Sequence, residues 1–188
     1  MNALYKDHPE YRNLIGSGGN EKRLTTSIFS LTSLFSDKAN DVDTIKILGL
    51  IDNKRYIKYI SPKYLESHNN LYKYKVILPK VNGTGEFGET LSSPLVGEPG
   101  LGFTQSFISF CSLDSREEAN NLLLYIKSKF LRAMLGILKA TQDNNSDVWK
   151  FVPLQDFSHP WTDAELYKKY GLTDEEISFI ESMIKPME

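Results

Sequence analysis

The chain contains one cysteine, Cys111, and three histidines in 188 residues. A single thiol excludes a disulfide framework and a thiolate metal site. His8, His68 and His159 lie in polar or turn segments without a second ligand at metal-site spacing, so we interpret them as surface residues. No run approaches the roughly 18 apolar residues that a membrane span needs, and no signal-peptide pattern follows Met1. The sequence therefore predicts a cytoplasmic protein without a membrane partner.

An excess of either charge is also absent, because 22 Lys and Arg residues face 24 Asp and Glu residues, for a net charge of -2. This balance excludes a uniformly basic surface, so any contact with nucleic acid must come from a local patch. The hydrophobic fraction of 40% is that of an ordinary globular protein. The length fits one domain, or one domain with a small appendage.

Apolar spacing, capping residues and turn residues predict the order of the elements. We expect a weak helix over 2–15, a helix over 21–35, a hairpin of strands 44–50 and 55–60, strands over 72–80 and 103–113, one helix over 115–142, and two short helices after Thr162 and Thr173. Capping boxes are expected at Ser115 with Glu118, Thr162 with Glu165 and Thr173 with Glu176. The order predicts an α+β (mixed α/β) fold, with a small β-sheet, a long packed helix and a helical C-terminal tail.

A glycine-rich loop, VNGTGEFGETLSSPLVGEPGLG, separates the strands over 72–80 and 103–113. A loop of this length is unusual in a compact domain unless it is functional or disordered. Gly83, Gly85 and Gly88 fit the pattern G-x-G-x-x-G, but a proline-containing loop follows where a dinucleotide site needs a helix N-terminus. We therefore do not expect dinucleotide binding.

A catalytic centre is not legible in the sequence. The best nuclease candidate is Asp52 with Lys54, which lies in a hairpin turn without an evident second carboxylate to complete a metal site. No nucleophile elbow or paired His and carboxylate system is present. An autonomous nuclease stays open as an alternative, and it predicts metal-dependent DNA cleavage.

A binding surface is the remaining interpretation. Lysines alternate with apolar residues in the strand before the loop, and uncharged polar side chains that can bond bases or phosphates follow them. The candidate DNA-binding residues are Lys73, Lys75, Lys80, Asn82, Thr84 and Gln105, together with Arg132 and Lys139 on the polar side of the predicted long helix. The competing interpretations are a polar loop that satisfies its own hydrogen bonds and a solvated helix flank.

Three runs carry a family resemblance: KVILPKVNGTGEFGETLSSPLVGEPGLGFTQSFISF, EEANNLLLYIKSKFLRAMLGILKATQD and VWKFVPLQDFSHPWTDAELYKKYGLTDEEISFIESMIKP. From about Ile57 to Glu188 the chain resembles the C-terminal region of bacterial restriction-modification enzymes with adenine-specific DNA methylase activity. The catalytic region of that family binds S-adenosylmethionine and holds the flipped adenine with an NPPY-type motif. This chain has neither that motif nor a cofactor-binding glycine loop.

The resemblance therefore implies the DNA target recognition domain of a type II restriction-modification methyltransferase, as a C-terminal fragment without catalytic or metal-binding residues. Its implied partners are double-stranded DNA and the catalytic methylase or nuclease region of the parent enzyme. The parent, not this chain, would use S-adenosylmethionine, and Mg²⁺ if it cleaves DNA. We expect a flexible N-terminal segment over 1–20, the recognition domain over 21–148, and a tail over 149–188 that packs on that domain or on the catalytic half. The alternative function is a protein-interaction domain that docks onto the catalytic subunit.

Overall fold

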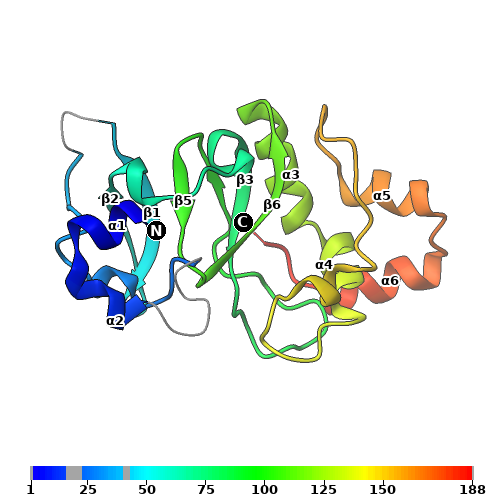
Figure 1. Ribbon diagram of the computed structural model, residues 1–188. Coiled ribbons are helices and arrows are strands. Elements are labelled where there is room, and N and C mark those ends of the chain that lie inside the picture. Colours follow the sequence, from blue (N-terminus) through cyan, green and yellow to red (C-terminus); the bar gives the residue numbers. More distant parts are fainter. Residues whose placement is uncertain (1, 16–22, 40–42, 188) are drawn as a thin grey trace. The chain divides into compact units, whose positions relative to one another are not determined.

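The computed structural model describes residues 2–15, 23–39 and 43–187 (Figure 1). The chain forms two compact units, each with its own sheet: unit 1 comprises Met1–Lys73 and Glu98–Phe107, and unit 2 comprises Tyr74–Gly97 and Ile108–Glu188. These boundaries differ from the expected ones at residues 20 and 148. The glycine-rich segment 16–20, where we expected flexibility, lies outside the described residues.

Unit 1 is built on a sheet with the strand order β2–β1–β5. The predicted hairpin is confirmed, since β1 and β2 pair antiparallel with Ile45 opposite Ile60 and Ile51 opposite Lys54. β5 pairs in parallel with only the first part of β1, from Lys46 to Leu48. The elements of this unit are α1 (Asn2–Asp7), α2 (Arg12–Ile15), β1 (Ile45–Ile51), β2 (Lys54–Ile60) and β5 (Leu101–Phe103), with 3-10 turns at Pro9–Tyr11, Ile28–Ser30, Pro62–Tyr64 and Asn69–Tyr72.

The predicted helix over 21–35 is wrong for the described part of that range. Residues 23–35 form turns and one 3-10 turn, Ile28–Ser30. Six of these residues are Ser or Thr, whose side chains compete for backbone hydrogen bonds and disfavour a helix interior. The apolar residues after Leu24 are nevertheless buried, and Phe29 packs against Gly49 of β1. Hydrophobic spacing thus located the core residues but not the backbone conformation.

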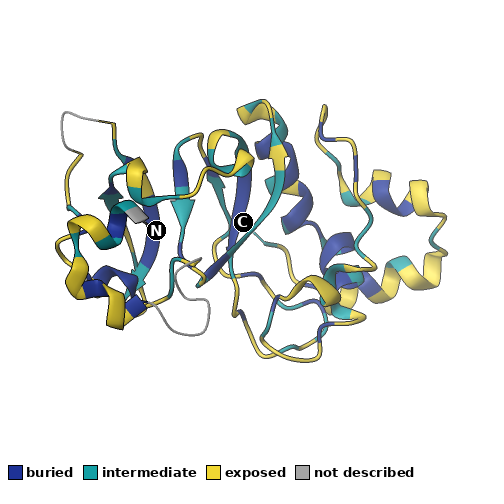
Figure 2. Cartoon of the chain, in the orientation of Figure 1, coloured by how far each residue is buried: buried dark blue, intermediate teal, exposed yellow. Residues whose placement is uncertain are grey.

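Unit 2 is built on a sheet with the strand order β4–β3–β6. Figure 2 shows β3 buried along most of its length, and Val76 and Leu78 on one face of it belong to the core that α3 and α4 cover. The long loop of the sequence is not structureless, because β4 lies within it and pairs back on β3. The elements are β3 (Tyr74–Pro79), β4 (Leu95–Gly97), β6 (Phe107–Leu113), α3 (Arg116–Lys127), α4 (Lys129–Gly136), a 3-10 turn at Ser146–Trp149, α5 (Asp163–Tyr170) and α6 (Asp174–Met183).

The single helix expected over 115–142 is two helices. Ser128 has an extended ψ of 151° and its side chain accepts a hydrogen bond from Leu131 N, so it ends α3 and caps α4. Asp163, from the start of α5, accepts hydrogen bonds from the backbone N–H groups of Lys129 and Phe130 at 3.2 and 2.8 Å. The apolar stripe continues across the break, which is why spacing alone did not reveal it.

The helical tail packs on α4 of the same unit (Figure 1). All three predicted capping boxes form, and Gly171 ends α5 with a left-handed φ of 65°. Ile180 and Ile184 of the tail are buried, whereas Met183 and Phe151 are 53% and 55% exposed.

The predicted α+β fold is confirmed, with six α-helices and two sheets of three strands in the described part of the chain. None of the helices in the described ranges combines the length and apolar content that crossing a bilayer requires.

Candidate nucleic-acid interface

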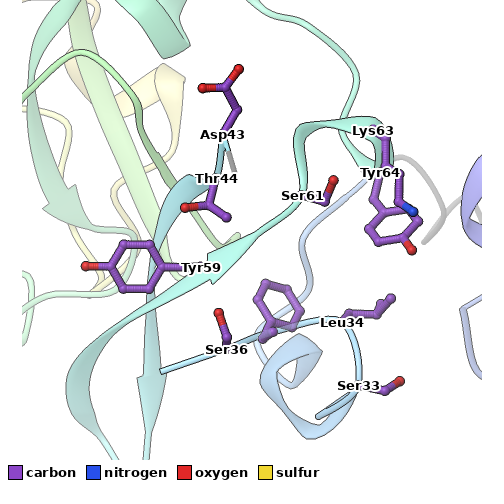
Figure 3. A pocket seen from close by; sticks show the side chains of 10 residues that line it. Ser33, Leu34, Ser36, Asp43, Thr44, Tyr59, Ser61, Lys63 and Tyr64 are labelled. Carbon is purple, nitrogen blue, oxygen red and sulfur yellow. The ribbon is translucent and has the colours of Figure 1, made fainter. Parts of the chain in front are cut away.

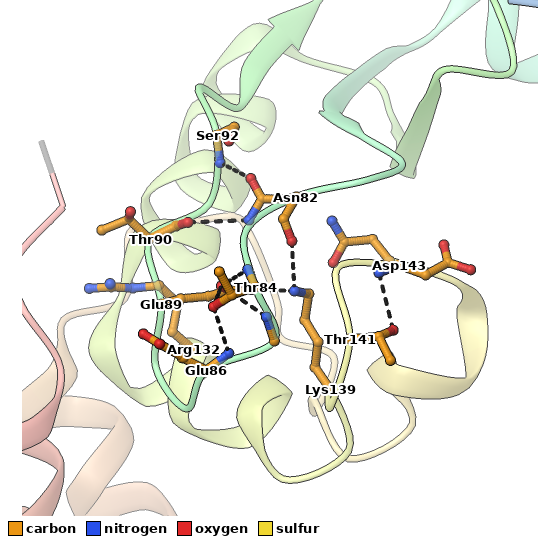
Figure 4. Close-up of polar contacts among 12 residues, drawn as sticks. Asn82, Thr84, Glu86, Glu89, Thr90, Ser92, Arg132, Lys139, Thr141 and Asp143 are labelled. Atoms are coloured by element: carbon orange, nitrogen blue, oxygen red, sulfur yellow. Dashed lines mark hydrogen bonds and ion pairs between the residues drawn. The ribbon is translucent and has the colours of Figure 1, made fainter.

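The loop that follows β3 is held together by one carboxylate, that of Glu89 (Figure 4). Its Oε2 accepts hydrogen bonds from the backbone N–H groups of Thr84 and Gly85 at 2.7 and 3.2 Å. Its Oε1 pairs with the ammonium group of Lys139. Burial raises the pKa of the Glu89 carboxyl, but Lys139 and the two N–H groups together lower it by more. The pKa of this carboxyl therefore lies below the ordinary value. The carboxylate is therefore a charged structural element of the loop.

Lys139 completes this bracket from the residues after α4. Its side chain is 2% exposed, and its Nζ donates to Glu89 and, at 2.9 Å, to the backbone oxygen of Asn82. Asn82 is 3% exposed, donates from Nδ2 to Thr90 O at 3.2 Å, and accepts from Ser92 N. Both side chains thus bind the loop to itself rather than presenting polar groups to solvent.

Arg132 fastens the same loop to the C-terminal tail. It is 1% exposed, and its guanidinium donates to the backbone oxygens of Gly88 and Lys185 at 3.2 and 2.5 Å. Burial lowers the pKa of Arg132, and the charge of Asp163 opposes that shift. The residue links two segments of unit 2 that are distant in sequence.

The glycines of the loop are explained by packing against the chain itself. Gly85 has a φ of 93°, and a Cβ atom there would lie 2.5 to 2.8 Å from the backbone of Ala140 and Thr141. A side chain would also be strained at this φ. At Gly85 the loop thus makes a close backbone approach to the residues after α4.

The structure therefore corrects half of the predicted DNA contacts. Four of the eight side chains are buried, and buried side chains cannot reach a duplex in this conformation; they are Lys75, Asn82, Arg132 and Lys139. Lys75 is fully buried, and burial lowers its pKa to about 8. The sequence pattern misled because a lysine that alternates with apolar residues in a strand was taken as solvent-exposed, whereas β3 is the central strand of its sheet and Lys75 is buried in it.

The other four candidates retain exposed surface but lie in different units. Lys80 and Thr84 are exposed in unit 2, at the edge of the bracketed loop. Lys73, half-buried, and Gln105, exposed, belong to unit 1. The structure thus brings Asn82, Thr84, Arg132 and Lys139 together as a structural cluster within unit 2.

Unit 1 contains a different candidate, the free end of its hairpin. Beyond Leu48 no third strand pairs with β1, so Gly49 to Tyr56 form a two-stranded ribbon. Asp52 and Asn53 form its turn with φ values of 49° and 60°, the conformation of a type I′ turn that matches the strand twist. A two-stranded ribbon is one of the two elements that the DNA major groove admits.

Cationic and aromatic side chains occupy this end of the hairpin. Lys54 is exposed and Tyr56 is 44% exposed. The half-buried Arg55 lies with its guanidinium 5.7 Å from the centroid of the Phe107 ring, and burial lowers its pKa. Because successive side chains of a strand alternate, Lys54 and Tyr56 provide charge and a stacking face on one side of the ribbon, and Arg55 provides charge on the other.

Gln105 joins the same neighbourhood. The backbone N–H of Thr104 donates to Leu48 O at 2.9 Å, and that of Gln105 donates to Leu24 O at 2.7 Å, next to the exposed Arg23. We define the hairpin surface as Arg23, Lys54, Arg55, Tyr56 and Gln105. Of these, sequence reasoning named only Gln105 as a DNA contact. The usable signal was the run KRY directly after a turn, of which we considered only Lys54, together with Asp52, as a nuclease candidate.

Charge is distributed unevenly between the units. Unit 1 carries eleven Lys and Arg residues against nine Asp and Glu residues, and unit 2 carries eleven against fifteen. The overall net charge of -2 thus combines an excess of two positive charges with an excess of four negative charges. The excess of positive charge thus lies in unit 1, and that of negative charge in unit 2.

Within the described ranges no three His, Cys, Asp or Glu side chains come together as metal ligands. No protein-family model matches the chain, and no curated protein or solved structure matches it either. The class that fold and site define is an α+β protein with a bracketed loop in one unit and an exposed basic hairpin in the other.

Proposed function

We propose that this chain is a DNA target recognition module of a restriction-modification enzyme, and that the hairpin surface of unit 1 contacts the duplex. The observation that carries the proposal is the free two-stranded ribbon with Lys54, Arg55 and Tyr56 at its end, beside Gln105. Cations at the ribbon neutralise phosphates and set its register. Gln105 supplies an amide that can pair with the N6 and N7 atoms of adenine in the major groove.

In this proposal the chain contributes recognition and the parent enzyme contributes chemistry. The resemblance to adenine-specific methylases supports this division, because no methylase motif is present in the sequence. S-adenosylmethionine, and Mg²⁺ for a parent that cleaves DNA, belong to the catalytic region. Unit 2 serves as the scaffold, since Glu89 of its polar loop, Arg132 of α4 and Lys139 after α4 are engaged in contacts within that unit.

The salt dependence of duplex binding tests the proposal. Fluorescence anisotropy is measured with the full chain and a labelled pool of random duplexes, from about 20 to 200 mM salt. Each phosphate contact contributes about 0.9 to the slope of log K against log salt. The double variant Lys54→Gln/Arg55→Gln should therefore reduce the slope by about 2 and weaken binding to all sequences.

A matched control has the same net charge as this double variant, but its two substitutions lie in unit 2. Lys150→Gln/Lys168→Gln removes two exposed charges there and should leave the slope unchanged. Gln105→Ala should alter the preference among sequences in a selection experiment more than the slope. Absence of binding at the lowest salt, or equal slopes for the two double variants, would refute the proposal.

The second candidate function is a protein-interaction domain that docks onto the catalytic subunit. It is favoured by exposed apolar side chains in unit 2, where Phe179 and Met183 lie on one face of α6, each 53% exposed, and the Phe179 ring is 5.6 Å from that of Phe87. Phe179→Asp should abolish co-purification with the catalytic region and leave duplex binding intact. If it abolishes duplex binding while Lys54→Gln/Arg55→Gln does not, the recognition hypothesis fails.

A further inference from the structure

Two polar groups at the pocket of unit 1 point away from it. The pocket has a volume of about 310 Å³ and is lined by the segment 33–36 and by residues before β1 and in and after β2 (Figure 3). The hydroxyl of Tyr59 and the carboxylate of Asp43 are directed away from the other lining residues. Sites for small molecules depend on a few polar groups aimed at one point, so this pocket selects no ligand. A chemically more specific feature lies in the loop after β3.

That loop contains the pair Asn82-Gly83, which is the one Asn-Gly dipeptide in the whole sequence. Asparagine before glycine is the pair most prone to spontaneous deamidation, because glycine has no side chain to hinder attack by its backbone nitrogen on the asparagine amide. The pair belongs to unit 2 and the hairpin surface to unit 1, so its chemistry does not depend on the function proposed above.

The packing of the loop requires both residues of the pair (Figure 4). Asn82 Nδ2 donates to Thr90 O at 3.2 Å while its Oδ1 accepts from Ser92 N, and an aspartate in its place could accept but not donate. Gly83 has a φ of 65°, and a Cβ atom there would collide with the Glu89 carboxylate. The fold thus depends on a chemically vulnerable dipeptide.

The same contacts protect the pair from reaction. Besides the two bonds of its side chain, the backbone N–H of Asn82 donates to Gln142 O at 2.7 Å, and its backbone oxygen accepts from Lys139 Nζ at 2.9 Å. Asn82 is also only 3% exposed. Deamidation requires the asparagine side chain to turn until its Cγ meets the glycine nitrogen, and water must then open the cyclic product. A fixed and buried Asn82 therefore reacts only after the loop opens locally.

We propose that Asn82 is a modification site that is latent in the folded loop: it deamidates when the loop opens, and the product prevents the loop from closing again. The Gly83 nitrogen attacks Cγ of Asn82, and the side-chain nitrogen leaves as ammonia with the proton of the Gly83 N–H. Water then opens the resulting succinimide to aspartate or isoaspartate. The net reaction consumes water and releases ammonia.

Neither product rebuilds the contacts of Asn82. Both lack the N–H donor for Thr90 O and place a negative charge beside that carbonyl oxygen. Isoaspartate also adds a methylene group to the backbone, so the N–H and C=O groups of residue 82 no longer meet Gln142 and Lys139 together. Deamidation is thus a one-way opening of the bracketed loop.

Peptide mass spectrometry of the full chain tests this proposal. The chain is incubated in mildly alkaline buffer, with and without urea, and the deamidated fractions of Asn82 and Asn145 are followed over time. Asn145 is exposed, precedes Ser146 and lies in the same unit, so it is an internal reference. The ratio of the rate at Asn82 to that at Asn145 should be at least about tenfold lower in the folded chain than in urea. An equal ratio in the two conditions overturns the proposal.

A charge variant tests whether the bracket controls the reaction. Glu89→Gln should raise the rate at Asn82 in the folded chain at least about tenfold, because it removes the anionic partner of Lys139. Glu86→Gln, an exposed control in the same loop, should leave the rate unchanged. Equal rates in these two variants would refute the control by the bracket. The comparison in urea uses the wild type, so it decides the protection of Asn82 whether or not Glu89→Gln folds.

The variant Asn82→Asp tests the effect of the product directly. It should accelerate hydrogen exchange at the amides of Thr84 and Gly85, which bond Glu89 in the closed loop, at least about fivefold. Wild-type exchange in Asn82→Asp, together with wild-type exchange in chains deamidated at Asn82 and isolated from the urea incubation, would overturn the one-way opening.

Discussion

Removal of the Glu89 charge tests whether the loop after β3 is a structural bracket. In Glu89→Gln the Lys139 ammonium, 2% exposed, loses its only anionic partner among the described contacts and keeps one bond to Asn82 O. Removing one partner of a buried ion pair costs about 3–5 kcal/mol, because it leaves an uncompensated buried charge. Gln retains an oxygen for the N–H groups of Thr84 and Gly85, so we expect the lower end, about 3 kcal/mol.

The assay is urea denaturation, followed by the fluorescence of Trp149 and Trp161, both in unit 2. Lys139→Met with intact Glu89 and the pair Glu89→Gln/Lys139→Met complete a double-mutant cycle. The double variant should be more stable than the sum of the single effects predicts, since it buries no unpaired charge. A cost below about 1 kcal/mol for Glu89→Gln would refute the interpretation of the loop as a bracket.

The same carboxylate predicts a pH dependence. The pKa of Glu89 is lower in the folded chain than its ordinary value of 4.5, so its stabilising contribution is complete above that value. The contribution is lost as the pH falls below 4.5 towards the lowered folded pKa. Urea midpoints of the wild type should therefore decline over this acid range, and those of Glu89→Gln should decline less. Equal decline in both proteins would contradict the assignment.

Two further predictions concern local structure. Asp163→Ala leaves the N–H groups of Lys129 and Phe130 without their acceptor and should destabilise unit 2 by about 2 kcal/mol in the same urea assay, whereas Ser158→Ala, an exposed control, should have little effect. Asn53→Gly suits the left-handed second position of the hairpin turn and should slow hydrogen exchange of the β1 and β2 amides, with a gain of about 0.5 kcal/mol. Asn53→Val should destabilise the hairpin by about 1 kcal/mol or more and so accelerate exchange, because a β-branched residue is strained at positive φ. The opposite order of the two variants would exclude the turn assignment.

Several features of the fold followed from local sequence alone. The hairpin and the three capping boxes were predicted correctly, since the hairpin turn and each capping box depend on residues within four positions of one another. The division of the helix at Ser128 was not predicted. That break is stabilised by Asp163, 35 residues further along the chain, and no periodicity in the helix itself reports such a contact.

The candidate site was predicted less well than the fold. A lysine or arginine in a sequence gives its charge but not its depth, and the strand position of Lys75 and the contacts of Arg132 and Lys139 bury all three. The hairpin surface was overlooked for the converse reason. Whether the hairpin end that carries Lys54 and Tyr56 is covered depends on where the third strand of the sheet ends. That strand is β5, which residues 101–103 supply from far along the chain.

The scarcity of cysteine and histidine, the balanced charge and the periodic apolar residues determined the class of protein: an α+β chain without a disulfide framework, built from elements that end at identifiable caps. Those properties are local or compositional. The tertiary structure alone decided that the glycine-rich loop binds itself through Glu89 and Lys139, and that Lys54 at the hairpin end remains exposed. The physical reason is that burial and pairing depend on partners about fifty residues away, such as Lys139 for Glu89, which no sequence spacing specifies.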